Sequence, residues 1–86
     1  MAYKLPISPR SSNAGRFIIS MHDDLRAAVI ESGKTYQQIA EALETDTDYV
    51  DAVMEGRRDL TLRVIADFMW AIEYKMDYTI RKKDTR

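Results

Sequence analysis

The sequence predicts a mainly α-helical fold, a compact bundle of four helices with a short C-terminal β-strand. Two observations carry this prediction: apolar residues recur at helical spacing in four successive stretches, and residues that start or stop helices bracket each stretch. The 86 residues suffice for one hydrophobic core but not for a large substrate cleft. We therefore expect one domain in residues 16–80, between a flexible basic arm (residues 1–15) and a basic tail (residues 81–86).

The first helix is predicted to begin at Ser20 and to end at Gly33. Ser20 and Asp23 have the spacing of a capping box, and glycine tolerates the left-handed conformation that ends many helices. The apolar face between them consists of Met21, Leu25, Ala28 and Val29. The β-branched stretch in residues 16–20 favours a short strand or an extended lead into this helix. The prolines, serines and glycine before it predict the flexible arm.

Two shorter helices follow. The second is predicted to start with a capping box formed by Thr35 and Gln38. The third can be capped by Thr45 or Asp46, is about ten residues long and ends at Gly56. Their apolar faces consist of Tyr36, Ile39, Ala40 and Leu43 in the second helix and of Val50, Val53 and Met54 in the third.

The fourth helix is predicted to begin near Thr61 and to be apolar nearly all round. One face holds Leu62, Ile65, Ala66, Met69 and Ile72, and another holds Val64, Phe68 and Ala71. Such a helix is central to a core or also buries a second face against a partner, and Trp70 is the residue that we expect to remain outside the core.

The stretch after the fourth helix alternates apolar and polar residues, which is the pattern of a half-buried strand. Its apolar members are Tyr74, Met76, Tyr78 and Ile80. Two partners are open for this strand: residues 17–19 of the same chain, or the equivalent strand of a second copy. The oligomeric state, monomer or homodimer, stays open with it, and Trp70, Met76, Tyr78 and Ile80 are the candidate dimer contacts.

Composition argues against several classes of function. The chain has no cysteine and a single histidine, His22, so we expect no metal site and no cofactor. His22 is interpreted as an exposed residue in the first turn of a helix, and no catalytic motif is present, so no catalytic residue is predicted and the chain is not expected to be an enzyme. No apolar run could span a bilayer and no signal peptide is recognised. We expect a cytoplasmic protein with no membrane partner.

Residues 36–55 show a more specific spacing. Ile39 and Leu43 occupy apolar positions, Ala40 a position where two helices cross closely, and Val50 and Val53 further apolar positions. In this spacing the chain resembles the Cro/CI-type (XRE-like) helix-turn-helix family of phage and bacterial repressors and related antitoxins. The resemblance implies a helix-turn-helix fold and covers about residues 33–72. The chain departs from the family pattern at four positions. Glu44 stands where the family usually has a turn glycine, and the other departures are at Thr45, Met54 and Leu60.

The resemblance also implies which residues would face DNA, and these have the wrong charge. They are Asp46, Thr47, Asp48, Asp51, Ala52 and Glu55, so four of the six are acidic and none is basic. The formal net charge of −1 is the sum of three stretches of different charge: residues 1–19 carry +3, residues 81–86 carry +3, and residues 20–80 carry −7. A folded nucleic-acid binder normally shows the reverse.

Two functions follow from these observations. The favoured one is a protein-interaction surface on the third helix, formed by Asp46, Asp48, Tyr49, Asp51 and Glu55, with a basic protein as the partner. The alternative is a sequence-specific DNA-binding regulator. Its contacts would come from Gln37, Thr47, Ala52, Arg57, Arg58 and Arg63. Arg57 and Arg58 are interpreted either as phosphate contacts or as ions that neutralise neighbouring acids.

Overall fold

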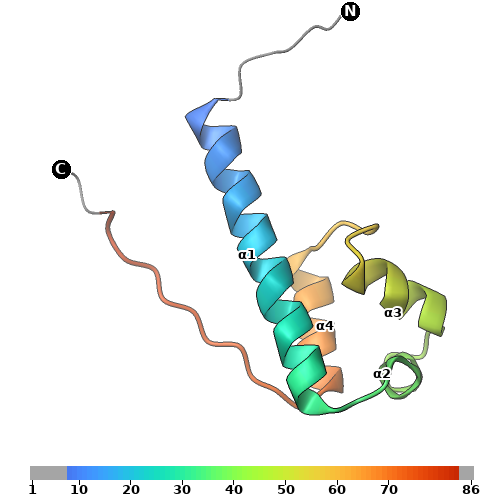
Figure 1. Cartoon of the computed structure of the whole chain (residues 1–86). Coiled ribbons are helices and arrows are strands. Elements are labelled where there is room, and N and C mark those ends of the chain that lie inside the picture. The colour runs from blue at the N-terminus through green and yellow to red at the C-terminus, as the bar shows by residue number, and fades with distance from the viewer. Residues whose placement is uncertain (1–7, 84–86) are drawn as a thin grey trace, which may run out of the picture.

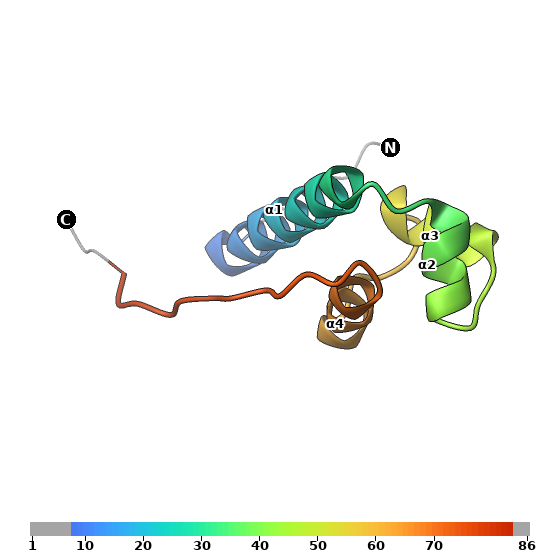
Figure 2. The ribbon, with the colours of Figure 1, turned by 90° about the horizontal axis from the view of Figure 1, so that it is seen from below.

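The computed structural model describes residues 8–83, which contain four α-helices. They are α1 (Pro9–Ser32), α2 (Tyr36–Ala42), α3 (Thr47–Met54) and α4 (Leu62–Ala71). α1 is a long straight rod, and the other three helices gather beside its second half (Figure 1). Seen from below, α2 and α3 lie together on one side of the molecule and α1 and α4 on the other (Figure 2). The predicted mainly helical fold with four helices is confirmed.

The hydrophobic core lies where the second half of α1 meets α2, α3 and α4. Its largest fully buried side chains come from all four helices and from the residue at the C-terminal cap of α4: Leu25, Ile39, Val50, Val53, Phe68 and Ile72. Each such side chain stabilises the fold by roughly 1.5–3 kcal/mol relative to exposure. Burial of one face per helix therefore holds the bundle together without disulfides.

Local capping explains where three of the helices begin. The Thr35 hydroxyl accepts a hydrogen bond from the Gln38 backbone N–H (3.1 Å), and the Gln38 side chain accepts one from the Thr35 N–H (2.8 Å). Asp46 caps α3 and Thr61 caps α4 in the same way, each accepting from an N–H three residues ahead. Gly33 ends α1 with φ +74°. These predicted boundaries are confirmed.

The predicted start of α1 is wrong. The helix is capped by Ser8, whose hydroxyl accepts from the Ser11 N–H at 3.1 Å, and Pro9 occupies the first helical position, where its missing N–H costs nothing. Residues 9–15 are therefore helical rather than a flexible arm, and residues 16–20 are helical rather than a strand. Residues 1–7, the rest of the predicted arm, lie outside the described residues.

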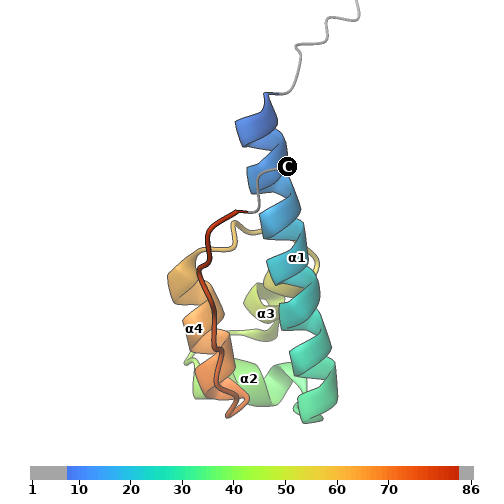
Figure 3. The ribbon, with the colours of Figure 1, turned by 90° about the vertical axis from the view of Figure 1, so that its left-hand side faces the viewer.

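The predicted C-terminal strand does not form within the single chain. Residues 73–83, which we call the C-terminal segment, follow α4 and run back toward the N-terminal end of α1 as extended chain (Figure 3). No strand forms within residues 8–83, because residues 17–19, the partner expected within the chain, belong to α1. Residues 84–86 of the predicted basic tail lie outside the described range. None of the described helices combines the length and apolarity that crossing a bilayer requires.

Candidate functional site

α3 is held in place by a tight turn that follows α2. The Glu44 and Thr45 backbone N–H groups donate to the carbonyls of Glu41 (3.2 Å) and Ala40 (2.9 Å), and Glu44 adopts the left-handed conformation with φ +57°. Ala40 is 3% exposed, as expected of a small residue at a close helix crossing. The turn and this crossing bury Val50 and Val53 and leave the acidic side of α3 outward.

This outward side carries four carboxylates, which we call the acidic surface: Asp46, Asp48, Asp51 and Glu55. Two of them share one cation, because Arg57 pairs through Nη2 with Asp51 (3.0 Å) and through Nε with Glu55 (2.8 Å). The hydrogen bond to Glu55 and the charge of that carboxylate, assisted by Asp51, raise the pKa of Arg57 above its ordinary value. The Arg57 guanidinium of this triad therefore stays charged and is paired within its own chain.

The other two carboxylates differ from each other. Asp46 accepts the Tyr49 backbone N–H at 2.9 Å and so serves the helix cap. Asp48 lies in the first turn of α3, where the helix dipole favours a negative charge, and it forms no ion pair with any residue in the range 8–83. Asp48 is consequently the carboxylate most available to a partner.

The residues predicted as DNA contacts do not gather into a basic site. Gln37 and Thr47 are exposed at the starts of α2 and α3, but Ala52 is only 8% exposed. The three arginines all contact their own chain. Arg57 forms the triad, the Arg58 guanidinium lies 4.9 Å from the centroid of the Tyr49 ring, and Arg63 pairs with Asp67 at 3.0 Å. The interpretation of Arg57 as a neutralising ion is the one that agrees with these contacts.

Tyr49, which belongs to the predicted protein-interaction surface, is not fully exposed. Its ring is half-buried against the core and lies 6.3 Å from the Phe68 ring, centroid to centroid. It forms part of the wall of a polar hollow of about 410 Å³, which is lined by Thr45, Asp46, Asp48, Tyr49, Ala52, Arg57 and Arg58. The hollow brings the acidic surface, Tyr49 and Arg58 together around α3.

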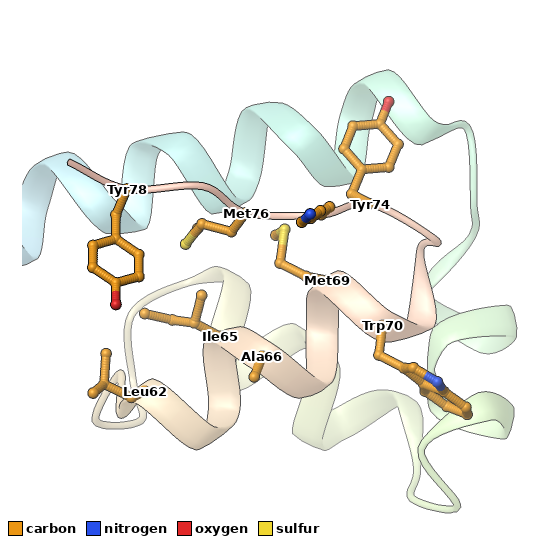
Figure 4. Close-up of a pocket in the computed structure, with 9 residues that line it drawn as sticks. Leu62, Ile65, Ala66, Met69, Trp70, Tyr74, Met76 and Tyr78 are labelled. Carbon is orange, nitrogen blue, oxygen red and sulfur yellow. The ribbon is translucent and has the colours of Figure 1, made fainter.

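Trp70 is an exposed aromatic residue that lines a neighbouring hollow. It is 68% exposed on α4 and borders a second hollow of about 400 Å³, which reaches Glu44 and Thr45 in the turn before α3. Its exposure was predictable from its position off the apolar stripes of α4, but its closeness to this turn was not. The other candidate dimer contacts lie away from α3: Met76 and Tyr78 point from the C-terminal segment toward α4 (Figure 4), and Ile80 is exposed further along that segment.

His22 also differs from its prediction. It lies in the middle of α1 rather than in a first turn, is half-buried, and its Nε2 lies 3.0 Å from the Val53 carbonyl oxygen. The imidazole thereby ties α1 to the end of α3. Among residues 8–83, no three histidine, cysteine or acidic side chains are grouped in a way that could hold a metal ion.

Comparisons with models of protein families, with characterised proteins and with solved structures found no match to this chain. Its function is therefore inferred from its own contacts and charges.

Proposed function

We propose that this protein is a small regulatory protein of helix-turn-helix type whose acidic surface on α3 binds the basic surface of another protein. The observation that carries the proposal is the balance of charge around α3. Four carboxylates line its outer side, and among residues 8–83 the one cation that pairs with them, Arg57, is shared between Asp51 and Glu55. The negative charge of Asp48 and Asp46 is left for a partner to neutralise.

DNA is the less favourable partner for such a surface. Each carboxylate held about 4 Å from a phosphate costs on the order of 1 kcal/mol even in water, and more where water is excluded. Arg57 already shares its charge between Asp51 and Glu55, so a phosphate bound at its remaining N–H groups would also meet the repulsion of these two carboxylates. A protein surface rich in lysine or arginine reverses the sign of these interactions and accelerates association.

Trp70 supports a protein partner. Exposed tryptophans are frequent anchors of protein interfaces because they bury a large area. Trp70 borders the hollow next to Glu44 and Thr45. This hollow shares Thr45 and Tyr49 with the hollow that Asp46 and Asp48 line, so a partner that spans both hollows would cover the Trp70 ring. The preferred partner therefore combines basic residues with an apolar contact.

Operator binding is the second candidate. It is favoured by the short turn between α2 and α3 and by the exposure of Gln37, Thr47 and Arg58 around it. Of the basic residues, Arg58 would bear most of the contact with phosphate, since Arg57 and Arg63 are paired.

Reversal of one charge separates the two candidates. Asp48→Lys is the suitable change, because Asp46 caps α3 and Asp51 belongs to the Arg57 triad. Asp24→Lys is the matched control, since Asp24 is an exposed acid of α1 that lines none of the hollows described above. Both variants and the wild type are titrated with a lysine-rich peptide and, separately, with random-sequence duplex DNA.

The proposal predicts that Asp48→Lys weakens peptide binding several-fold more than Asp24→Lys does. Equal effects of the two variants on peptide binding would contradict a localised site. Tight, sequence-selective wild-type binding to DNA that persists when the salt is raised from about 50 mM to 200 mM would favour the operator-binding candidate instead. Far-UV circular dichroism verifies the fold of each variant, since a lysine in the first turn of a helix costs about 0.3–1 kcal/mol.

A further inference from the structure

A continuous apolar surface lies on the side of the molecule that carries the C-terminal segment. It consists of two hollows, one of about 430 Å³ between α4 and the C-terminal segment and one of about 330 Å³ between α1 and α4. Leu62 and Ile65 line both, so the hollows adjoin. In the first, Met76 and Tyr78 point toward α4 (Figure 4). We call this the α4 apolar surface.

The C-terminal segment beside it has unused hydrogen-bonding capacity. Tyr74 is its last residue to form a backbone hydrogen bond, donating to the Met69 carbonyl at 2.9 Å. Residues 75–83 form no backbone–backbone hydrogen bond with any other residue in the range 8–83. An extended chain with alternating apolar residues and free N–H and C=O groups is a template for pairing with another strand.

We propose that residues 74–78 pair with the same residues of a second copy of this chain, forming an antiparallel two-stranded ribbon over the α4 apolar surface. The structure removes the partner within the chain, because residues 17–19 are helical. A second copy is the partner that the segment's own sequence fits. This inference is independent of the function proposed for α3.

The register of the ribbon follows from charge. When Met76 lies opposite Met76 of the second copy, Lys75 lies opposite Asp77 and Asp77 opposite Lys75, while Tyr74 and Tyr78 pair on the apolar face. Moving the centre to Asp77 would place two aspartates opposite each other, and moving it to Lys75 would pair two lysines. A shift by a single residue, with Met76 opposite Lys75 or Asp77 of the second copy, would place apolar side chains on the same face as polar ones. The sequence is thus self-complementary about Met76.

The exposed apolar area suits a dimer. Phe17 and Tyr78 are 60% and 83% exposed. At about 200 Å² per aromatic side chain they alone offer on the order of 300 Å². A stable interface buries about 800 Å² per partner, and Leu62 at 79% exposed and Ile18 at 52% add to the available area.

The test is a charge swap measured by sedimentation of the full chain over a range of concentrations. Lys75→Asp and Asp77→Lys each place like charges opposite each other twice in the dimer, and each should raise the dimer dissociation constant about tenfold or more. The double variant restores opposite charges and should recover most of the wild-type affinity. Lys82→Asp is the matched control, since it makes the same charge change outside residues 74–78 and should not weaken the dimer.

Both positions are exposed, so circular dichroism should show the same fold in every variant. A wild-type chain that stays monomeric at all concentrations would overturn the proposal. So would a dimer that is insensitive to the single variants, or one that the double variant fails to restore.

Discussion

Single residues in the left-handed conformation end all four helices. Gly33 follows α1 and Gly56 follows α3, but Glu44 and Glu73 occupy the equivalent positions after α2 and α4, with φ +57° and +63°. After α2, α3 and α4 the next residue donates its N–H to a carbonyl five positions back: Thr45 to Ala40, Arg57 to Ala52 and Tyr74 to Met69. This pattern satisfies carbonyls that the helix itself leaves unpaired. The two glutamates hold it at a cost in strain of about 1–2 kcal/mol each.

Glu44→Gly should therefore stabilise the protein by about 1 kcal/mol, because glycine adopts the left-handed conformation without strain. Urea denaturation measures the change in the free energy of unfolding. Glu41→Gly removes the same charge three residues earlier, inside α2, and should destabilise by about 1 kcal/mol because glycine is a poor helix former. A loss of stability in Glu44→Gly would contradict the strain.

Tyr74 links the C-terminal segment to α1, since its hydroxyl donates to the Glu31 carboxylate at 3.0 Å. This hydrogen bond, with desolvation and the charge of Glu31, raises the pKa of Tyr74 above 10.0, its ordinary value. The stabilising effect is fully present below the unfolded-state pKa, near pH 10, and is lost as the pH rises through the higher folded-state value. Wild-type stability should fall more steeply above about pH 10 than that of Tyr74→Phe. Parallel pH curves for the two proteins would exclude the effect.

At the scale of elements, the two halves of α1 differ in burial. Its buried residues, Leu25 and Val29, both lie in the second half. Residues 9–20 contribute no buried side chain, so helix propensity and capping matter more there than packing. The exposed apolar side chains of residues 17–19 belong to this first half and are available to the second copy proposed above.

Substitutions at and next to Gly15 test whether the first half of α1 is helical. A methyl group added at Gly15 would meet no atom within 4 Å, so Gly15→Ala should stabilise the local helix by about 0.5–1 kcal/mol. Ala14→Gly is the reciprocal control and should destabilise it by a similar amount. Amide hydrogen exchange in residues 9–20 should slow in the first variant and accelerate in the second. Unchanged exchange in both would contradict a helical first half.

The helix boundaries that the sequence predicts correctly depend on short-range contacts. Thr35, Asp46 and Thr61 each bond to an N–H three residues ahead, and Gly33 has the expected conformation. The start of α1 was missed because Ser20 and Asp23 resemble a capping box although they lie inside a continuous helix. The C-terminal segment forms no strand in the single chain, because alternation of apolar and polar residues suits pairing but cannot supply the partner strand.

The candidate site was predictable in its charges but not in its contacts. Once the bounds of α3 are predicted, the sequence shows that its outer side is acidic. The sharing of Arg57 between Asp51 and Glu55 depends on how the chain turns after Gly56, and the packing of Tyr49 on Phe68 depends on where α4 lies. Both involve side-chain geometry that no short sequence pattern determines.

At the scale of the whole molecule, charge is separated along its length. The acids concentrate around α2 and α3, whereas Arg10 and Arg16 lie in the first half of α1 and residues 81–83 end the described C-terminal segment. Both basic stretches extend away from α2 and α3 (Figure 1). Any affinity for nucleic acid should therefore come from these stretches, lack sequence preference and weaken steeply with salt.

The most direct test of the account is the binding of the wild-type chain to a library of random-sequence duplex DNA at about 50 mM and 200 mM salt. The acidic surface predicts no binding, or weak and unselective binding that disappears at the higher salt. Submicromolar, sequence-selective binding that survives at the higher salt would contradict the account and identify α3, despite its carboxylates, as a DNA-reading helix.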